Sequence, residues 1–149
     1  MKKLLLAIIL SSAFVSCSES DQKFNVVETT IGEIQEALIS GQITCREVVS
    51  KYLLRIESYD KTSGINAITV INPEALAKAD AMDRAIISNE ELPQLFCAPI
   101  VVKDNFDTYD MVTSGGSVIL KNSYPPDDAF MVRKLREAGA IIIAKTNMA

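Results

Sequence analysis

The sequence has 149 residues, about the size of one domain, and 48% of them are hydrophobic while 23% are charged. This balance is typical of globular proteins and excludes an intrinsically disordered chain. The formal net charge is −4 and Lys and Arg form no block, which excludes a nucleic-acid partner because such a partner needs a basic surface. We therefore expect a small-molecule partner.

The sequence contains no histidine. A Ser-His-Asp triad, a Cys-His dyad and a histidine-ligated zinc site are therefore excluded, and any general base must be Lys, Asp or Glu. The three cysteines, Cys17, Cys45 and Cys97, lack the close paired spacing of a zinc site, so we predict no metal and no cofactor. Cys45 and Cys97 are equally compatible with a disulfide and with two buried thiols.

The N-terminal residues carry an export pattern. Lysines follow Met1, and residues 4–15 form an apolar run too short to span a bilayer comfortably. We predict a signal peptide over residues 1–16 and a polar tether over residues 17–28. The residues before Cys17 resemble a bacterial lipoprotein cleavage box, which implies lipid attachment at Cys17 and an exported, periplasmic or membrane-anchored protein. Phe14 stands where that box usually has Leu, so a cleaved secretory signal beside an incidental cysteine is the alternative.

Two capping boxes open two amphipathic helices. The pairs Thr30/Glu33 and Thr44/Glu47 have the Thr-x-x-Glu spacing in which hydroxyl and carboxylate satisfy free amides at a helix start. Apolar residues then recur at helical spacing. The predicted helices cover residues 31–40 and 45–58.

A strand and helix alternation follows. Asn72-Pro73 supplies a cap and a first-turn proline for a helix after a β-branched run. The elements predicted from there are a strand over residues 66–71, a helix over 73–87, an apolar strand over 98–104, a glycine-bearing loop over 108–116, a helix over 128–138 and a strand over 140–144. Two apolar strands joined through a helix imply a right-handed crossover between parallel strands. The predicted fold class is α/β, with a mixed or parallel sheet covered by helices.

The helix over residues 128–138 is expected to turn an apolar face inward and a charged face to solvent. The predicted inner residues are Phe130, Met131, Val132 and Leu135, and the predicted solvated residues are Arg133, Lys134, Arg136 and Glu137.

Both apolar strands end in a lysine followed by two polar residues. These triplets are Lys103-Asp104-Asn105 and Lys145-Thr146-Asn147. Sites in parallel α/β sheets lie beyond the carboxyl ends of the strands, so the two triplets are expected to meet there. A lysine directly after four apolar residues can be desolvated, which lowers its pKa and makes the neutral amine more accessible. The alternative is that each lysine only marks a strand reaching solvent.

Two long motifs in the expected order carry a family resemblance. Residues 98–108, Ala-Pro-Ile-Val-Val-Lys-Asp-Asn-Phe-Asp-Thr, are similar to the lysine motif of the amidase signature family, usually Gly-Ile-Pro-(three apolar residues)-Lys-Asp-Asn-Ile-Asp-Thr. Residues 127–148 resemble the helix and strand that follow in the same family. Cys97-Ala98 stands where the family commonly has Gly-Ile, and glycine permits backbone angles that cysteine resists.

The resemblance implies an amide hydrolase with a Ser-cis-Ser-Lys triad, in which Lys103 is the base. Both serines belong to a later glycine-serine-rich motif, and residues 113–117 match an earlier stretch of the family, so neither Ser114 nor Ser117 is nominated. Asp104 and Asn105 are expected to anchor Lys103 and the following loop through local hydrogen bonds. The other candidates for a supporting role are Lys145, Thr146 and Asn147.

The resemblance also implies the N-terminal part of the amidase signature fold over residues 29–149, incomplete at the C-terminus. The sequence stops directly after a predicted buried strand, so we expect a fragment that is inactive as given. The alternative hypothesis is a non-catalytic exported lipoprotein domain that binds a ligand. A cytosolic relative of the enzyme that amidates glutamyl-tRNA is disfavoured by the export pattern. Neither the oligomeric state nor the identity of the amide follows from the sequence.

Overall fold

The computed structural model describes residues 24–88 and 90–148, and within them three strands form one mixed sheet. The strands are β1 (Ile68–Ile71), β2 (Pro99–Lys103) and β3 (Ile141–Thr146). Strand β3 lies in the centre, parallel to β2 and antiparallel to β1. The predicted parallel pair of apolar strands is confirmed, and β1 makes the sheet mixed.

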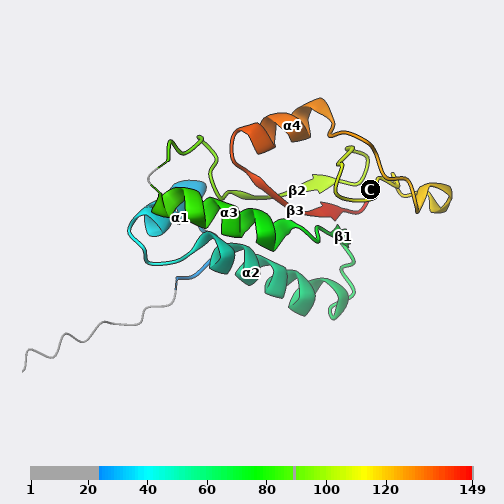
Figure 1. Cartoon of the computed structure of the whole chain (residues 1–149). Coiled ribbons are helices and arrows are strands. Elements are labelled where there is room, and N and C mark those ends of the chain that lie inside the picture. The colour runs from blue at the N-terminus through cyan, green and yellow to red at the C-terminus, as the bar shows by residue number, and fades with distance from the viewer. Residues whose placement is uncertain (1–23, 89, 149) are drawn as a thin grey trace, which may run out of the picture.

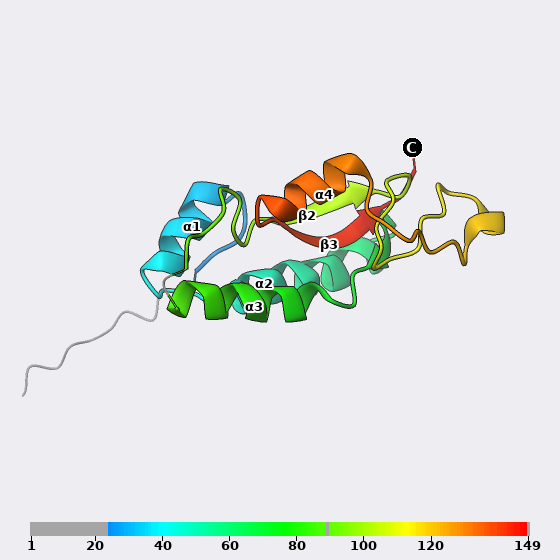
Figure 2. The same ribbon diagram turned by 45° about the horizontal axis from the view of Figure 1, so that its top comes forward.

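Helices cover both faces of this sheet. They are α1 (Ile31–Ile39), α2 (Cys45–Ile56), α3 (Ala75–Ile87) and α4 (Phe130–Glu137), with a π-helical turn over Glu57–Lys61 and a 3₁₀ turn over Val118–Leu120. Helix α4 lies on one face of the sheet, and α2 and α3 lie on the other (Figures 1 and 2). None of the helices in the described residues has the length and apolar content needed to cross a bilayer.

The helix starts follow from the capping boxes. Thr30 accepts a hydrogen bond from the Glu33 amide while the Glu33 carboxylate accepts one from the Thr30 amide, and Thr44 and Glu47 repeat the arrangement at α2. Each capping box thereby satisfies two amides at its helix start, as the sequence predicts.

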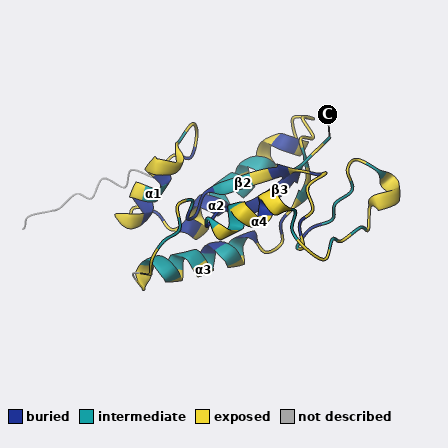
Figure 3. Cartoon of the chain, turned by 90° about the horizontal axis from the view of Figure 1, so that it is seen from above, coloured by how far each residue is buried: buried dark blue, intermediate teal, exposed yellow. Residues whose placement is uncertain are grey.

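Two apolar clusters hold the layers together. The larger cluster packs α1, α2 and α3 against one side of β3, and includes Val48, Ala79 and Ile143. The smaller cluster packs α4 against the other side through Val132 and Ile142. In contrast, the loop that carries Val118–Leu120 projects from the body and is exposed (Figures 1 and 3).

Strand β3 contains one extra residue relative to β2. Ile142 pairs with Ile100 and Ala144 pairs with Val101, so Ile143 has no partner in β2. Ile143 and Ala144 both belong to the larger cluster, which means that the alternation of faces is interrupted between them. Lys145 is thereby turned to the side of Ile142.

Helix α4 differs from its prediction in extent and in its inner face. It begins at Phe130 rather than near residue 128. Val132 is fully buried, but Phe130 is 61% exposed and Met131 is 58% exposed, so the prediction that both face inward is wrong. In a helix of eight residues only one narrow stripe reaches the sheet, and these two side chains lie outside it.

A disulfide between Cys45 and Cys97 joins the start of α2 to the segment before β2, with the Cα atoms 5.7 Å apart. The structure therefore selects the disulfide from the two states that the sequence leaves open. The predicted signal peptide over residues 1–16 and the predicted lipid attachment at Cys17 lie outside the described residues. Val26, within the predicted tether, is buried, and its carbonyl accepts a hydrogen bond from the Tyr52 hydroxyl at 3.1 Å.

Candidate active site

The two lysine triplets meet at one edge of the sheet. Lys103, the last residue of β2, pairs with Thr146 of β3, and the Asp104 amide donates to the Thr146 carbonyl at 3.0 Å. The prediction that the carboxyl ends of the two strands lie together is confirmed. Strand β3 continues through Lys145 and Thr146, two residues further than predicted, which puts Lys145 inside the sheet.

Lys103 and Asp104 face opposite sides of the sheet. Val102 and Asp104 are buried on the side of α4, whereas Val101 and Lys103 alternate with them and are exposed. The ammonium group of Lys103 is therefore presented at the open side of the sheet edge. For Lys103, the interpretation as a strand end that reaches solvent agrees with this structure.

Asp104 binds the loop that follows it in the chain. Its side chain is 1% exposed and accepts hydrogen bonds from the Ser114 amide at 3.3 Å, from the Ser114 hydroxyl and from the Gly116 amide at 3.5 Å. Burial raises the pKa of this carboxyl group, but these hydrogen bonds and the charge of Lys145 outweigh it, so the pKa lies below its ordinary value. The expected anchoring of the loop by Asp104 is thus present.

Lys145 is the buried lysine of the pair. Its side chain is 0% exposed, and Nζ donates to the Val112 carbonyl at 2.9 Å and to the Thr113 hydroxyl at 2.6 Å. Nζ also lies 3.5 Å from Oδ1 of Asp104. Burial lowers the pKa of Lys145, and the Asp104 carboxylate offsets part of that effect. For Lys145, the interpretation as a residue that marks a strand reaching solvent is wrong, because the extra residue in β3 turns it inward.

Two glycines allow the loop to close over this ion pair. Gly115 and Gly116 have φ values of 55° and 78°, in the left-handed region that glycine adopts at little cost. A Cβ on Gly116 would lie 3.1 Å from Cγ of Met148, a tight contact that would require the methionine side chain to move. The sequence signal for this loop is the Gly-Gly pair, but nothing in it identifies Thr113 and Ser114 as partners of the strand ends.

The remaining predicted residues have different surroundings. Asn105 is exposed, and Thr146 is partly buried. The Asn147 side chain donates to the Asn66 carbonyl at 3.2 Å, and its amide donates to the Ala67 carbonyl at 2.7 Å. Asn147 therefore fastens the end of β3 to the segment before β1, away from Lys103.

The structure contains a second buried ion pair, between α4 and the loop after β2, that the sequence did not predict. Arg136 donates to both oxygens of Asp110 at 2.7 and 2.8 Å, and its Nε lies 3.0 Å from Asp128. Asn72 donates to the same Asp110 at 2.9 Å. The prediction that Arg136 is solvated is wrong, because the loop before α4 folds back over this side chain. This charged contact, in which one guanidinium nitrogen of Arg136 lies against both oxygens of Asp110, fixes α4 to the loop that leads from β2.

The site combines an exposed amine with a rigid, buried support. A lysine at a strand end can act as a general base when it is neutral, and the Asp104–Lys145 pair fixes the backbone on which it stands. The described residues contain no cluster of three or more Cys, Asp or Glu side chains suited to a metal ion. A pocket of about 710 Å³ lies elsewhere, between α2 and β1, and its lining is mainly apolar.

Comparison with known proteins places this geometry in a family. The Amidase family matches residues 47–149, which include both lysine triplets and the loop between them. The chain belongs to the Amidase family. Within that family, it is 39% identical over 120 residues to a glutamyl-tRNA(Gln) amidotransferase subunit of Prochlorococcus marinus, covering 80% of this chain and 24% of that protein. The corresponding protein of Geobacter sulfurreducens is 43% identical over 121 residues, again 80% of this chain and 24% of the relative.

Solved amidase structures share the fold. The peptide amidase from Stenotrophomonas maltophilia superimposes with a TM-score of 0.78 at 35% identity, over 82% of this chain and 25% of that one. A bacterial aryl acylamidase of the amidase signature family superimposes with a TM-score of 0.73 at 28% identity, over 80% of this chain and 25% of that one. The predicted fold class is confirmed. The chain spans about a quarter of the length of the amidases it matches.

Proposed function

We propose that this chain supplies the lysine base of an amidase that converts an amide into a carboxylic acid and ammonia or an amine. The observation that carries the proposal is the position of Lys103, at the exposed end of β2 within the part of the chain that matches the family. The alternative, a non-catalytic lipoprotein domain, would need no amine at this place.

In the proposed mechanism Lys103, as the neutral amine, takes a proton from a serine on a cis peptide bond. That serine in turn takes the proton of a second serine, whose oxygen attacks the amide carbon. The C–N bond breaks, the nitrogen leaves with a proton, and water releases the acid from the acyl-enzyme. Both serines belong to a motif that follows residues 1–149 in the family, so we expect these residues alone to be inactive.

Asp104 and Lys145 serve as positioning residues in this proposal. Asp104 is the immediate neighbour of Lys103, and its carboxylate is held by the loop and by the buried ammonium group. A shift of this pair moves the backbone of Lys103, and small misplacements of a catalytic group reduce rates strongly. Thr146 is paired with Lys103 across the sheet and belongs to the same support.

Hydrolysis by the full-length gene product tests the proposal on a panel of simple aliphatic and aryl amides. We expect Lys103→Ala to lower kcat by about 100-fold or more, since a positioned base contributes roughly that much. Lys61→Ala, which removes another exposed lysine, is the matched control and should retain the wild-type rate. A folded Lys103→Ala variant with unchanged turnover would refute the role of Lys103, and a wild-type protein that binds amides without hydrolysing them would favour the alternative.

We further propose that the protein is exported and anchored to a membrane through a lipid on Cys17. The support is the basic and apolar N-terminal pattern that ends at this cysteine. Detergent phase partitioning of wild-type protein and of Cys17→Ser tests it. Transfer of the variant to the aqueous phase is the expected result, and equal partitioning of both proteins into the aqueous phase would contradict lipidation.

A further inference from the structure

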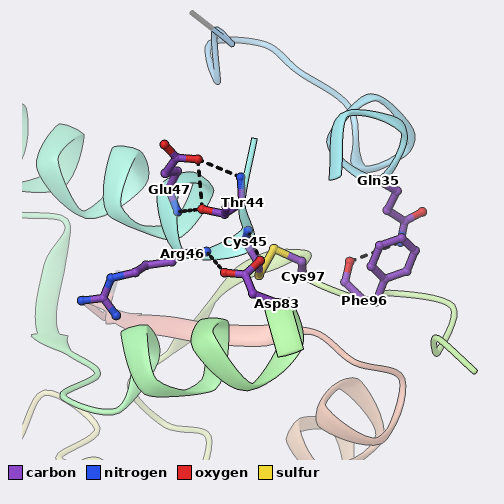
Figure 4. The surroundings of a disulfide bond; sticks show 8 residues. All are labelled: Gln35, Thr44, Cys45, Arg46, Glu47, Asp83, Phe96 and Cys97. Carbon is purple, nitrogen blue, oxygen red and sulfur yellow. Dashed lines mark hydrogen bonds between the residues drawn. A yellow bond between two sulfur atoms is a disulfide. The ribbon is translucent and has the colours of Figure 1, made fainter. Parts of the chain in front are cut away.

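The disulfide between Cys45 and Cys97 joins two elements that are distant in the sequence. The two residues are 52 positions apart, and neither has any solvent exposure. Cys45 is the first residue of α2, and Cys97 lies two residues before β2, the strand that ends in Lys103 (Figure 4). The bond thus ties a helix start to the beginning of the strand that carries the proposed base.

Cys97 has a backbone conformation that does not suit a cysteine. Its φ is 57°, in the left-handed region where a side chain costs roughly 1–2 kcal/mol and where glycine is the usual residue. The turn is tight, because the Ala98 amide donates to the Leu95 carbonyl at 3.0 Å while the Cys97 amide donates to the Gly139 carbonyl at 3.1 Å. Cys97 therefore occupies a backbone conformation that is unfavourable for its side chain, at a turn whose hydrogen bonds require that conformation.

The other end of the bond is fixed independently. The Asp83 carboxylate of α3 accepts hydrogen bonds from the amides of Cys45 at 2.6 Å and Arg46 at 3.0 Å (Figure 4). Together with the Thr44–Glu47 capping box, this satisfies the amides at the start of α2 and holds that start against α3. Cys45 is therefore a well-held point of attachment for the turn at Cys97.

We propose that the Cys45–Cys97 disulfide is an oxidation-dependent lock that holds the turn before β2 and thereby the strand of Lys103. The bond forms by thiol–disulfide exchange, in which the two thiols give up two electrons and two protons and a disulfide-bonded donor is reduced to its dithiol. Thiol–disulfide oxidoreductases of an oxidising compartment supply such a donor, whereas the reducing cytoplasm does not. This inference is independent of the proposed amide hydrolysis, and it requires the mature protein to fold after export.

Peptide mapping of the protein purified from the oxidising compartment tests the bond itself. After alkylation under denaturing conditions without reductant, we expect the peptides of Cys45 and Cys97 to be linked and unalkylated. After reduction, both cysteines should be alkylated. Alkylation of both residues before reduction would overturn the proposal, because two free buried thiols cannot lock the turn.

Stability measurements test the lock. Reduction should raise the equilibrium constant for unfolding by about 1000-fold, the effect expected for opening a closed loop of this length. Because a variant can fail to fold, wild-type protein with and without reductant is the primary comparison. Equal urea midpoints in the two conditions would overturn the proposal.

Two double variants separate the cross-link from the turn. Cys45→Ala/Cys97→Gly and Cys45→Ala/Cys97→Ala both lack the bond, but only the first relieves the left-handed position. We expect the glycine variant to have an unfolding equilibrium constant about five-fold lower than the alanine variant. Equal stabilities would show that the turn at Cys97 needs no lock. None of these measurements depends on amide turnover.

Discussion

Replacing Asp104 with Asn leaves the ammonium group of Lys145 buried without its carboxylate. At the observed 3.5 Å the attraction between the two charges is about 5 kcal/mol with an effective dielectric constant of about 20. The free-energy cost of desolvating both ions offsets much of that attraction. When Asp104 loses its charge, the desolvation cost of the Lys145 ammonium group remains without any attraction to compensate it. We therefore expect Asp104→Asn to lower the free energy of unfolding by about 3–5 kcal/mol.

The opposite substitution should be less harmful. In Lys145→Met the carboxylate of Asp104 keeps its hydrogen bonds from Ser114 and Gly116, and methionine fills much of the space of the lysine stem. We expect a loss of about 2–3 kcal/mol, and a double variant about as stable as Lys145→Met. Urea unfolding of the four proteins gives the coupling energy between the two residues. Losses that add to within about 0.5 kcal/mol would refute the reasoning, because they would mean that the two charges do not stabilise one another.

Three further predictions concern pH and local geometry. The pKa of Asp104 is lowered in the folded state, so the stability that its carboxylate contributes should be fully present above the ordinary pKa of 3.8 and lost as the pH falls further. Unfolding curves from pH 7 to pH 3 should therefore show that wild type is more stable than Asp104→Asn until the pH falls below about 4, where this advantage disappears. Gly139→Ala should lower the urea midpoint more than Gly41→Ala. Both glycines have positive φ, but only a Cβ at position 139 would meet other atoms, with Cγ of Pro93 at 2.5 Å. Equal losses in the two variants would contradict this contact. Asp83→Ala should lower the stability measured by thermal unfolding by about 1–2 kcal/mol, because the Asp83 carboxylate caps α2. Asp80→Ala breaks only an exposed ion pair and should lower it by under about 1 kcal/mol. The reverse order would contradict the capping role.

The starts of α1 and α2 could be predicted because they depend on local patterns. Thr30 and Thr44 are followed by glutamate three positions later, and the structure has both capping boxes where the sequence places them. Asn72 shows the limit of such patterns. The sequence predicts that it caps α3, but α3 begins at Ala75, and the Asn72 side chain accepts from the Glu74 amide and donates to the Ile142 carbonyl. A contact with β3 thus decides the position of this side chain.

The site was predictable only in part for a similar reason. The carboxyl ends of β2 and β3 had to meet, since the strands are parallel. Which lysine is buried could not be predicted, because Lys103 and Lys145 each follow four apolar residues. The difference arises from the extra residue in β3, which turns Lys145 inward, and from the loop with Thr113 and Ser114 that closes over that side of the sheet. The pairing of Cys45 with Cys97 likewise depends on the approach of two distant segments.

The extra residue in β3 changes how this strand should be aligned with others. Ile142 and Lys145 face the same side although they are three positions apart, a separation that puts side chains on opposite sides of a regular strand. A related strand that is one residue shorter before the lysine would reach the same orientation with regular pairing. A one-residue gap at Ile143 would therefore keep the side of the sheet that the lysine faces, at the cost of one buried side chain of the larger cluster.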